Sequence, residues 1–193
     1  MREVVWTPWD QPGMEHLILR TADDGGTEAT SHVSGLVDGR PFSIRYCIVA
    51  DTYWRVWRLS VSEAHRASGI DLYSDEPGSW KLGTGEPVES LEGCIDIDIT
   101  ATPFTNTYPI RWLQLAQGVS AEISVVYVWV PSLEVTVERQ RYTCLEPNAL
   151  YRFESLAGDE TIFQADLPVD SDGIVVDYPD LFRRVVTDQD AAI

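Results

Sequence analysis

Residues 93–113 read GCIDIDITATPFTNTYPIRWL, and the apolar–polar alternation in the first half of this stretch predicts a β-strand. Such a strand would set Ile95, Ile97 and Ile99 on one face and Cys94, Asp96, Asp98 and Thr100 on the other. Two carboxylates on one strand face repel each other, so they need water, a cation such as Arg111 or a bound ligand nearby. The run TPFTNTYP (102–109) that follows contains two prolines and predicts a stiff, polar, turn-rich loop.

Runs of the same kind recur along the rest of the chain and predict an all-β fold. Alternating or β-branched residues fill 16–20, 42–49, 53–61, 70–73, 94–100, 123–130, 133–142, 149–154 and 174–178. Turn-forming pairs such as Asp38-Gly39 and Gly158-Asp159 separate these runs, and no long amphipathic helix is visible. We therefore expect antiparallel hairpins in a meander, with no helix available to fill the hollow that a curled sheet would enclose.

The chain also aligns with itself at a shift of about 81 residues. Phe42-Ser43-Ile44 falls on Ile123-Ser124-Val125, Leu72 on Phe153, Pro87-Val88 on Pro168-Val169, and Asp96 on Asp177. Internal repetition predicts a duplicated antiparallel sheet with similar halves at about 33–98 and 114–179. Residues 1–193 would then form a single domain, with 185–193 as a loose C-terminal tail. Chance matching is the alternative, since few residue types fill strands.

The composition excludes several classes of partner. A net charge of −17 argues against nucleic acid and against anionic membrane surfaces, because both reward clustered lysine and arginine. No run is apolar enough for a secretory signal or a transmembrane segment. Cys47, Cys94 and Cys144 are widely spaced, and the histidines fall in no metal-ligating motif. We predict a cytoplasmic protein with free, buried thiols, without a metal or another cofactor.

A set of residues that runs from about Trp6 to Arg184 matches a known sequence pattern. It comprises residues 93–113, Asp51, Trp54, Trp80, QRYT (140–143) and GIVVDYP (173–179). On these residues the chain resembles the glycolipid-binding family of bacterial and archaeal proteins. The resemblance implies a duplicated antiparallel sheet curled into a spiral β-roll or half-barrel, and a glycolipid or related lipid as ligand. One departure is Trp112, where the family pattern has a second arginine after the position of Arg111.

Candidate ligand-binding residues come from this motif and from the aromatic strands. In YWRVWRLSV (53–61), alternation places Trp54 and Arg58 on one face and Arg55 and Trp57 on the other. Faces that pair tryptophan with arginine suit stacking against a sugar or a headgroup, and they suit packing between sheets equally well. The full set of candidates is Trp54, Trp57, Arg58, Trp80, Asp96, Asp98, Thr105, Asn106, Arg111, Gln140 and Tyr142.

We therefore expect a protein that binds an amphiphilic small molecule on a concave, aromatic-lined β-sheet and catalyses no reaction. The polar head would lie near Asp96, Asp98, Asn106 and Arg111, with the apolar chain on the concave face. One alternative is a hydrolase-type enzyme that uses Asp96 and Asp98, with Asp177 as a third carboxylate for a metal, on a sugar or phosphorylated substrate. Another is a structural module that forms homo-oligomers around a filled core, in which the aspartates accept hydrogen bonds from the protein itself.

Overall fold

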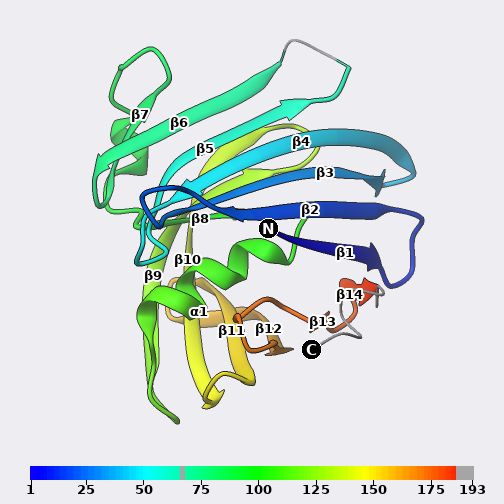
Figure 1. Ribbon diagram of the computed structural model, residues 1–193, viewed down its shortest axis with the longest axis vertical. Coiled ribbons are helices and arrows are strands. Elements are labelled where there is room, and N and C mark those ends of the chain that lie inside the picture. The colour runs from blue at the N-terminus through cyan, green and yellow to red at the C-terminus, as the bar shows by residue number, and fades with distance from the viewer. Residues whose placement is uncertain (66–67, 186–193) are drawn as a thin grey trace.

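Seven consecutive antiparallel strands form the first sheet of the computed structural model, which describes residues 1–65 and 68–185 (Figure 1). They are β1 (Arg2–Pro8), β2 (Met14–Thr21), β3 (Thr27–Val37), β4 (Arg40–Ala50), β5 (Val56–Glu63), β6 (Gly69–Glu76) and β7 (Ser79–Leu82). The chain returns at its other end to extend this sheet, because β14 (Phe182–Val185) pairs with β1 and β13 (Asp177–Tyr178) pairs with β14. The all-β prediction and the predicted meander are confirmed.

The second sheet has five strands, in the order β12-β11-β10-β9-β8. They are β8 (Asp96–Ile99), β9 (Ser120–Trp129), β10 (Glu134–Glu146), β11 (Leu150–Ala157) and β12 (Glu160–Pro168), and the short helix η1 (Glu89–Leu91) precedes β8. Strands β9 to β12 form a second antiparallel meander, whereas β8 pairs with β9 in parallel. A parallel pair needs a long crossover connection, and this one contains η2 (Phe104–Asn106) and α1 (Thr107–Leu113). Figure 1 shows α1 in the middle of the molecule, between the two sheets.

The helical crossover corrects the prediction of a polar loop at residues 102–109. Thr102 Oγ1 accepts a hydrogen bond from the Phe104 backbone N–H at 3.0 Å, which starts the turn. Pro109 lies in the first turn of α1, where a missing N–H costs no helical hydrogen bond. Tyr108 and Ile110 are buried, so tertiary packing supports a helix that the sequence pattern does not suggest. The expectation that no helix would fill the space inside the sheets is therefore wrong.

Both faces of the five-stranded sheet contribute side chains to buried apolar clusters. Val126 and Val128 join a core cluster with residues of the nine-stranded sheet, such as Trp6 and Ile48. The opposite face contributes to a second cluster, which includes Val125, Tyr142, Phe153 and Tyr178. On the face of β8 that carries the aspartates, Asp96 is fully buried, whereas Asp98 is only half-buried.

Strand β5 departs from the alternation predicted for residues 53–61. Residues 51–55 form the connection between β4 and β5, with a turn at 52–53 and a positive φ of 67° at Trp54. A β-bulge follows, because Val49 pairs with Arg58 while the adjacent Ala50 pairs with Val56. Trp57 is the extra residue and is 43% exposed, whereas strict alternation places it on one face with Leu59 and Val61, which are buried.

At a shift of 81 residues the strands follow one another in the same order in both parts of the chain, but they pair in different registers. At a shift of 81 residues, β6 (69–76) falls on β11 (150–157). In the first half, Ile44 of β4 pairs with Glu63 of β5. A shift of 81 residues converts this pair to Val125 and Cys144, but Val125 of β9 pairs with Glu138 of β10. At the end of the chain, Val185 belongs to β14 and is not part of a loose tail, and the rest of the predicted tail, 186–193, lies outside the described residues.

Candidate functional site

Asp98 is the centre of a polar cluster on one face of the five-stranded sheet. Its Oδ1 accepts a hydrogen bond from Thr105 Oγ1 at 2.6 Å, and its Oδ2 accepts one from Gln140 Nε2 at 2.7 Å. Burial raises the pKa of the Asp98 carboxyl above its ordinary value, and these two hydrogen bonds oppose the rise. Both donors are neutral, so a half-buried carboxylate without a cationic partner among the described residues remains at this position.

The cluster continues through Tyr142 to η2. The Tyr142 hydroxyl donates to Asn106 Oδ1 at 2.9 Å, with Gln140 Oε1 as a second acceptor at 3.2 Å. Gln140 and Tyr142 are two residues apart on β10 and therefore share a strand face, while Thr105 and Asn106 both belong to η2. The structure thus brings together five of the predicted site residues.

Asp96 is fully buried and has partners of its own. Its Oδ2 accepts a hydrogen bond from Trp112 Nε1 at 2.7 Å, and its Oδ1 accepts one from the Ile97 backbone N–H at 2.8 Å. Burial raises the pKa of Asp96 to about 8, the two hydrogen bonds oppose this rise, and the nearby Asp98 adds to it. Trp112 therefore supplies a neutral donor to a buried carboxyl group.

Arg111 does not pair with either aspartate, so it is not the cation that the sequence suggested as one possible partner for them. Successive helix residues point about 100° apart, so α1 directs Trp112 to Asp96 and Arg111 elsewhere. The Arg111 guanidinium carbon lies 4.6 Å from the centre of the Trp54 ring, and Arg111 Nη1 donates to the Asp172 carbonyl at 3.2 Å. Arg111 and Trp54 line a cavity of about 460 Å³ that does not include the aspartates.

A groove of about 370 Å³ lies beside Asp98 and is lined by residues from every strand of the five-stranded sheet. We call it the aromatic groove. Asp98, Asn106 and Glu138 are polar residues of its lining, and its aromatic residues are Tyr127, Trp129, Phe153, Phe163, Tyr178 and Phe182. The C-terminal hairpin, β13 and β14, supplies the last two, so the groove lies where the helical crossover and the hairpin leave part of the sheet uncovered.

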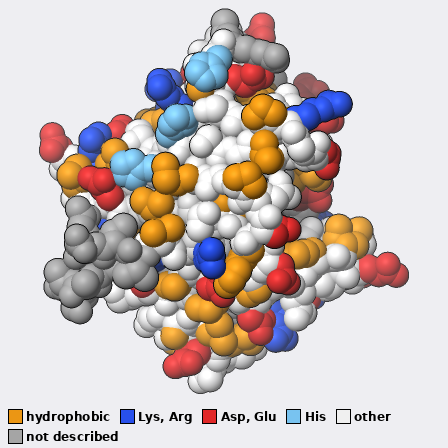
Figure 2. Space-filling view, turned by 90° about the vertical axis from the view of Figure 1, so that its right-hand side faces the viewer, with side chains coloured by type: hydrophobic (Ala, Val, Ile, Leu, Met, Phe, Trp, Pro, Cys, Tyr) orange, Lys and Arg blue, Asp and Glu red, His pale blue; other side chains and the backbone are white. Residues whose placement is uncertain are grey.

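Large apolar side chains at the rim of the aromatic groove are exposed. Ile162 is 62% exposed, Trp129 43%, Leu181 40% and Phe163 39%. Figure 2 shows the face on the right-hand side of Figure 1, where hydrophobic side chains gather in patches among acidic and basic ones. Exposed apolar side chains around one cavity are typical of a surface that contacts a ligand or a partner.

The sequence analysis did not select the aromatic residues of the groove. A signal was present in VVYVWV (125–130), where aromatic residues alternate with valines, so Tyr127 and Trp129 share a strand face. Tyr127 is the direct partner of Asp98 in the parallel pairing of β8 and β9. The parallel pairing is what brings this face to Asp98, and the predicted meander did not contain it.

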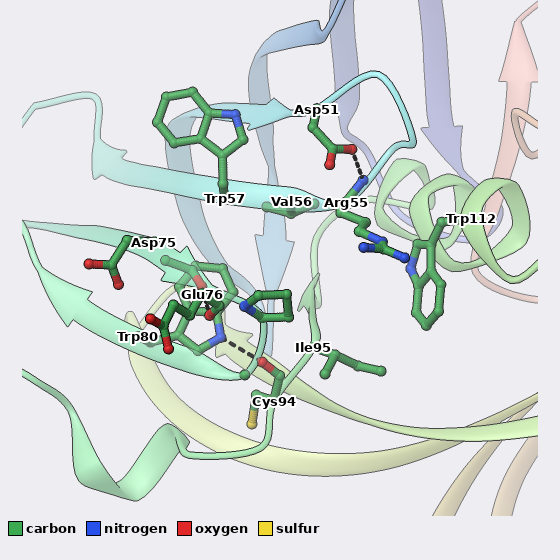
Figure 3. Close-up of a pocket in the computed structure, with 13 residues that line it drawn as sticks. Asp51, Arg55, Val56, Trp57, Asp75, Glu76, Trp80, Cys94, Ile95 and Trp112 are labelled. Carbon is green, nitrogen blue, oxygen red and sulfur yellow. Dashed lines mark hydrogen bonds between the residues drawn. The ribbon is translucent and has the colours of Figure 1, made fainter.

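Trp57 and Trp80, two other predicted site residues, line a separate cavity of about 360 Å³ together with Trp112 (Figure 3). We call this cavity the tryptophan cleft. Arg58 lies outside both the cleft and the aromatic groove and forms an ion pair with Asp71 at 3.3 Å. The predicted aromatic and cationic residues are thus distributed over different parts of the molecule.

The fold and the aromatic groove define an all-β protein with a cavity of the size that small-molecule binding proteins carry. The chain belongs to the family described as “Putative glycolipid-binding”, whose sequence pattern matches residues 3–184. The resemblance found in the sequence is therefore confirmed.

The solved structures that are similar to this chain include one from Pseudomonas aeruginosa and one from Brucella abortus. A DUF1089 family protein from Pseudomonas aeruginosa is 38% identical, with a TM-score of 0.78 over 92% of this chain and 95% of that one. A beta-barrel-like protein of the DUF1849 domain of unknown function from Brucella abortus is 10% identical, with a TM-score of 0.57 over 96% of this chain and 95% of that one. The second likeness shows the fold alone. No curated protein matches the chain.

Three further features bear on the expected chemistry. Within residues 1–65 and 68–185, no helix is long and apolar enough to cross a membrane. The same residues contain no group of three histidine, cysteine or acidic side chains that could hold a metal, so Asp177 does not complete a cluster with the aspartates of β8. The three cysteines are free; Cys94 and Cys144 are buried, but Cys47 is only half-buried.

Proposed function

We propose that the protein binds an amphiphilic small molecule, a glycolipid or related lipid, in the aromatic groove. The observation that carries this proposal is a half-buried carboxylate and a rim of exposed apolar side chains in one cavity. Contiguous exposed apolar patches on globular proteins mark interaction sites or ligand grooves. The volume of the groove falls in the range of about 300–1,000 Å³ that ligand pockets occupy. The family description supports the same class of ligand.

The polar part of the ligand would contact Asp98 and Asn106. A carboxylate offers about four acceptor sites, and Asp98 accepts from Thr105, from Gln140 and from the backbone N–H of Ile99. The remaining acceptor capacity suits a hydroxyl group of a sugar headgroup, which is a donor. Because buried side chains hold the carboxylate in one orientation, little entropy is lost when a ligand binds to it.

The apolar part of the ligand would lie along the aromatic side chains of the groove. Burial of about 200 Å² of apolar ligand surface would contribute about 5 kcal/mol at roughly 25 cal/mol per Å². A hydrogen bond to a charged group contributes about 1.5–3 kcal/mol. We infer that the alkyl portion supplies most of the affinity, while the cluster around Asp98 selects the headgroup.

The hydrolase alternative has less support from the geometry. An acid–base pair must present both carboxyl groups to one substrate. Asp96 is fully buried with hydrogen bonds to both of its oxygens, and only Asp98 lines the groove.

The free cysteines support the inference that the protein binds its ligand in the cytoplasm.

Native mass spectrometry of gently purified protein, followed by organic extraction, tests the proposal directly. We expect a bound lipid or glycolipid, and saturable binding of added dodecyl maltoside below its micellar concentration. Ile162→Asp places a charge at the rim of the groove and should weaken maltoside binding at least about tenfold, because a charge resists burial against an alkyl chain. Ile162 is 62% exposed, so the substitution leaves the core intact.

Val137→Asp is the matched control for the groove variant. Val137 is 41% exposed on β10 of the same sheet, but it does not line the aromatic groove. The control should bind dodecyl maltoside as the wild type does. The proposal is overturned if the wild-type protein carries no lipid and takes up no detergent, or if both variants bind equally well.

A further inference from the structure

The tryptophan cleft combines three indole rings with charged groups of both signs. Its tryptophans come from separate elements: Trp57 from β5, Trp80 from β7 and Trp112 from α1. Figure 3 shows Trp57 and Trp80 toward one side of the view, and Arg55 and Trp112 toward the other. The proposed lipid-binding function uses none of these residues.

The aromatic walls of the cleft are fixed by buried hydrogen bonds. Trp80 is 2% exposed, and its Nε1 donates to the Cys94 carbonyl at 2.7 Å. Trp112 Nε1 donates to the buried Asp96 at 2.7 Å. Trp57, by contrast, extends from the β-bulge and is 43% exposed. The cleft therefore has two immobilised rings and one ring at its opening, and such a site binds with little loss of side-chain entropy.

The polar lining of the cleft provides both donors and acceptors. The Arg55 guanidinium forms no hydrogen bond or ion pair with any described residue, although its backbone N–H donates to Asp51 Oδ1 at 2.9 Å. Asp51 and Glu76 add carboxylates to the lining. Asp75 is already paired with Lys81 at 2.5 Å. A guanidinium alone would attract an anion, but the carboxylates in the same lining repel anions. The cleft is therefore not a simple anion site.

We propose that the tryptophan cleft is a second binding site, which takes a pyranose sugar through its apolar C–H face and its hydroxyl groups. An apolar sugar face packs on an exposed indole ring, which is a large and rigid surface with a polar edge. Trp57 offers such a face at the opening of the cleft, while Trp80 is only 2% exposed. The hydroxyl groups, each a donor and an acceptor, match a lining that holds Arg55 together with carboxylates. The volume of about 360 Å³ falls in the range of ligand pockets and has room for one or two sugar rings.

This site is independent of the aromatic groove. Ile95 lines the cleft and Asp98 lines the groove, so the two cavities lie toward opposite ends of β8. The linings of the two cavities share no residue. Sugar binding at the cleft and lipid binding at the groove can therefore succeed or fail separately.

Titration with free sugars tests the proposal. Tryptophan fluorescence and ligand-observed NMR would be recorded with glucose, galactose, mannose, N-acetylglucosamine, maltose and cellobiose. We expect at least one of these sugars to bind, and Trp57→Ala to weaken its binding about tenfold through loss of one stacking surface. Trp57→Phe should retain most of the affinity, and Arg55→Gln should reduce it because the cationic donor is lost.

Trp9→Ala is the matched control, since Trp9 is 44% exposed and lies outside the cleft. This variant should bind the sugar as the wild type does. Ile162→Asp should also bind the sugar normally, even where it loses detergent. The proposal is overturned if no sugar binds, if Trp57→Ala binds as well as wild type, or if inorganic phosphate alone reproduces the fluorescence change.

Discussion

Replacing Asp96 by asparagine should flatten the pH dependence of stability. Burial raises the pKa of Asp96 from an ordinary value of 3.8 to about 8 in the folded protein. Between these values the unfolded chain gains free energy by ionising, while the folded protein keeps the carboxyl group protonated. The free energy of unfolding therefore falls as pH rises. With these two pKa values, the Asp96 contribution falls by about 3 kcal/mol between pH 5.5 and pH 8.5.

Urea unfolding at several pH values, followed by circular dichroism, measures this effect. The wild type should lose stability toward pH 8.5, and Asp96→Asn should lose about 3 kcal/mol less over the same range. The variant also loses part of the hydrogen bonding to Trp112 and the backbone, which lowers its stability by a similar amount at every pH.

Asp166→Asn is the control for the pH experiment. Asp166 pairs with Arg152 at 2.7 Å, which lowers the pKa of Asp166, so this carboxyl stays ionised from pH 5.5 to pH 8.5. The control should shift the whole stability curve and leave its slope unchanged. A slope for Asp96→Asn equal to that of the wild type would refute the assignment of a raised pKa to Asp96.

Three further predictions concern other buried or structural groups. Glu15→Gln should also reduce the loss of unfolding free energy with rising pH, by less than Asp96→Asn does, because burial raises the pKa of Glu15 to about 7. An unchanged pH dependence in urea unfolding would contradict this. Thr105→Val removes the hydroxyl that donates to Asp98 at 2.6 Å, and it should lower the free energy of unfolding by about 1–3 kcal/mol and weaken dodecyl maltoside binding. Wild-type stability in thermal unfolding together with wild-type binding would show that the hydroxyl does not position Asp98. Asp51→Ala removes the acceptor for two backbone N–H groups at 2.8 and 2.9 Å and should lower the free energy of unfolding by about 1–2 kcal/mol. Asp51→Asn keeps a side-chain oxygen as the acceptor and should unfold near the wild-type temperature.

The strands were predictable where β-branched and aromatic residues alternate, as in β4 and β9. Strand β3, with the sequence TEATSHVSGLV, was missed because small and polar residues weaken its pattern, although it pairs along its whole length with β4. The helix α1 was missed because TYPIRWL contains a proline and too few residues for a helical period. In both cases the neighbouring elements stabilise the structure, and the local sequence does not show them.

The candidate site was predictable in its residues more than in its arrangement. The motif around Asp98 suggested a polar cluster, and the hydrogen bond from Gln140 joins strands that are 42 positions apart in the chain. Trp57 was assigned to the wrong face because a bulge adds one residue to β5, and alternation cannot show where a bulge occurs. Neighbouring strand pairs and bulges depend on the whole sheet, so a strand face read from sequence shows which residues can meet but not whether they do.

The pairing of β1 with β14 places the first and last strands side by side in one sheet. During synthesis the N-terminal meander can form early, but the outer edge of β1 stays without its partner until residues 182–185 have left the ribosome. An open strand edge is a template for pairing with other chains. The nascent protein therefore has an unpaired β1 edge for most of its translation. A premature stop before β14 should produce chains that aggregate, because β1 would remain an open edge strand.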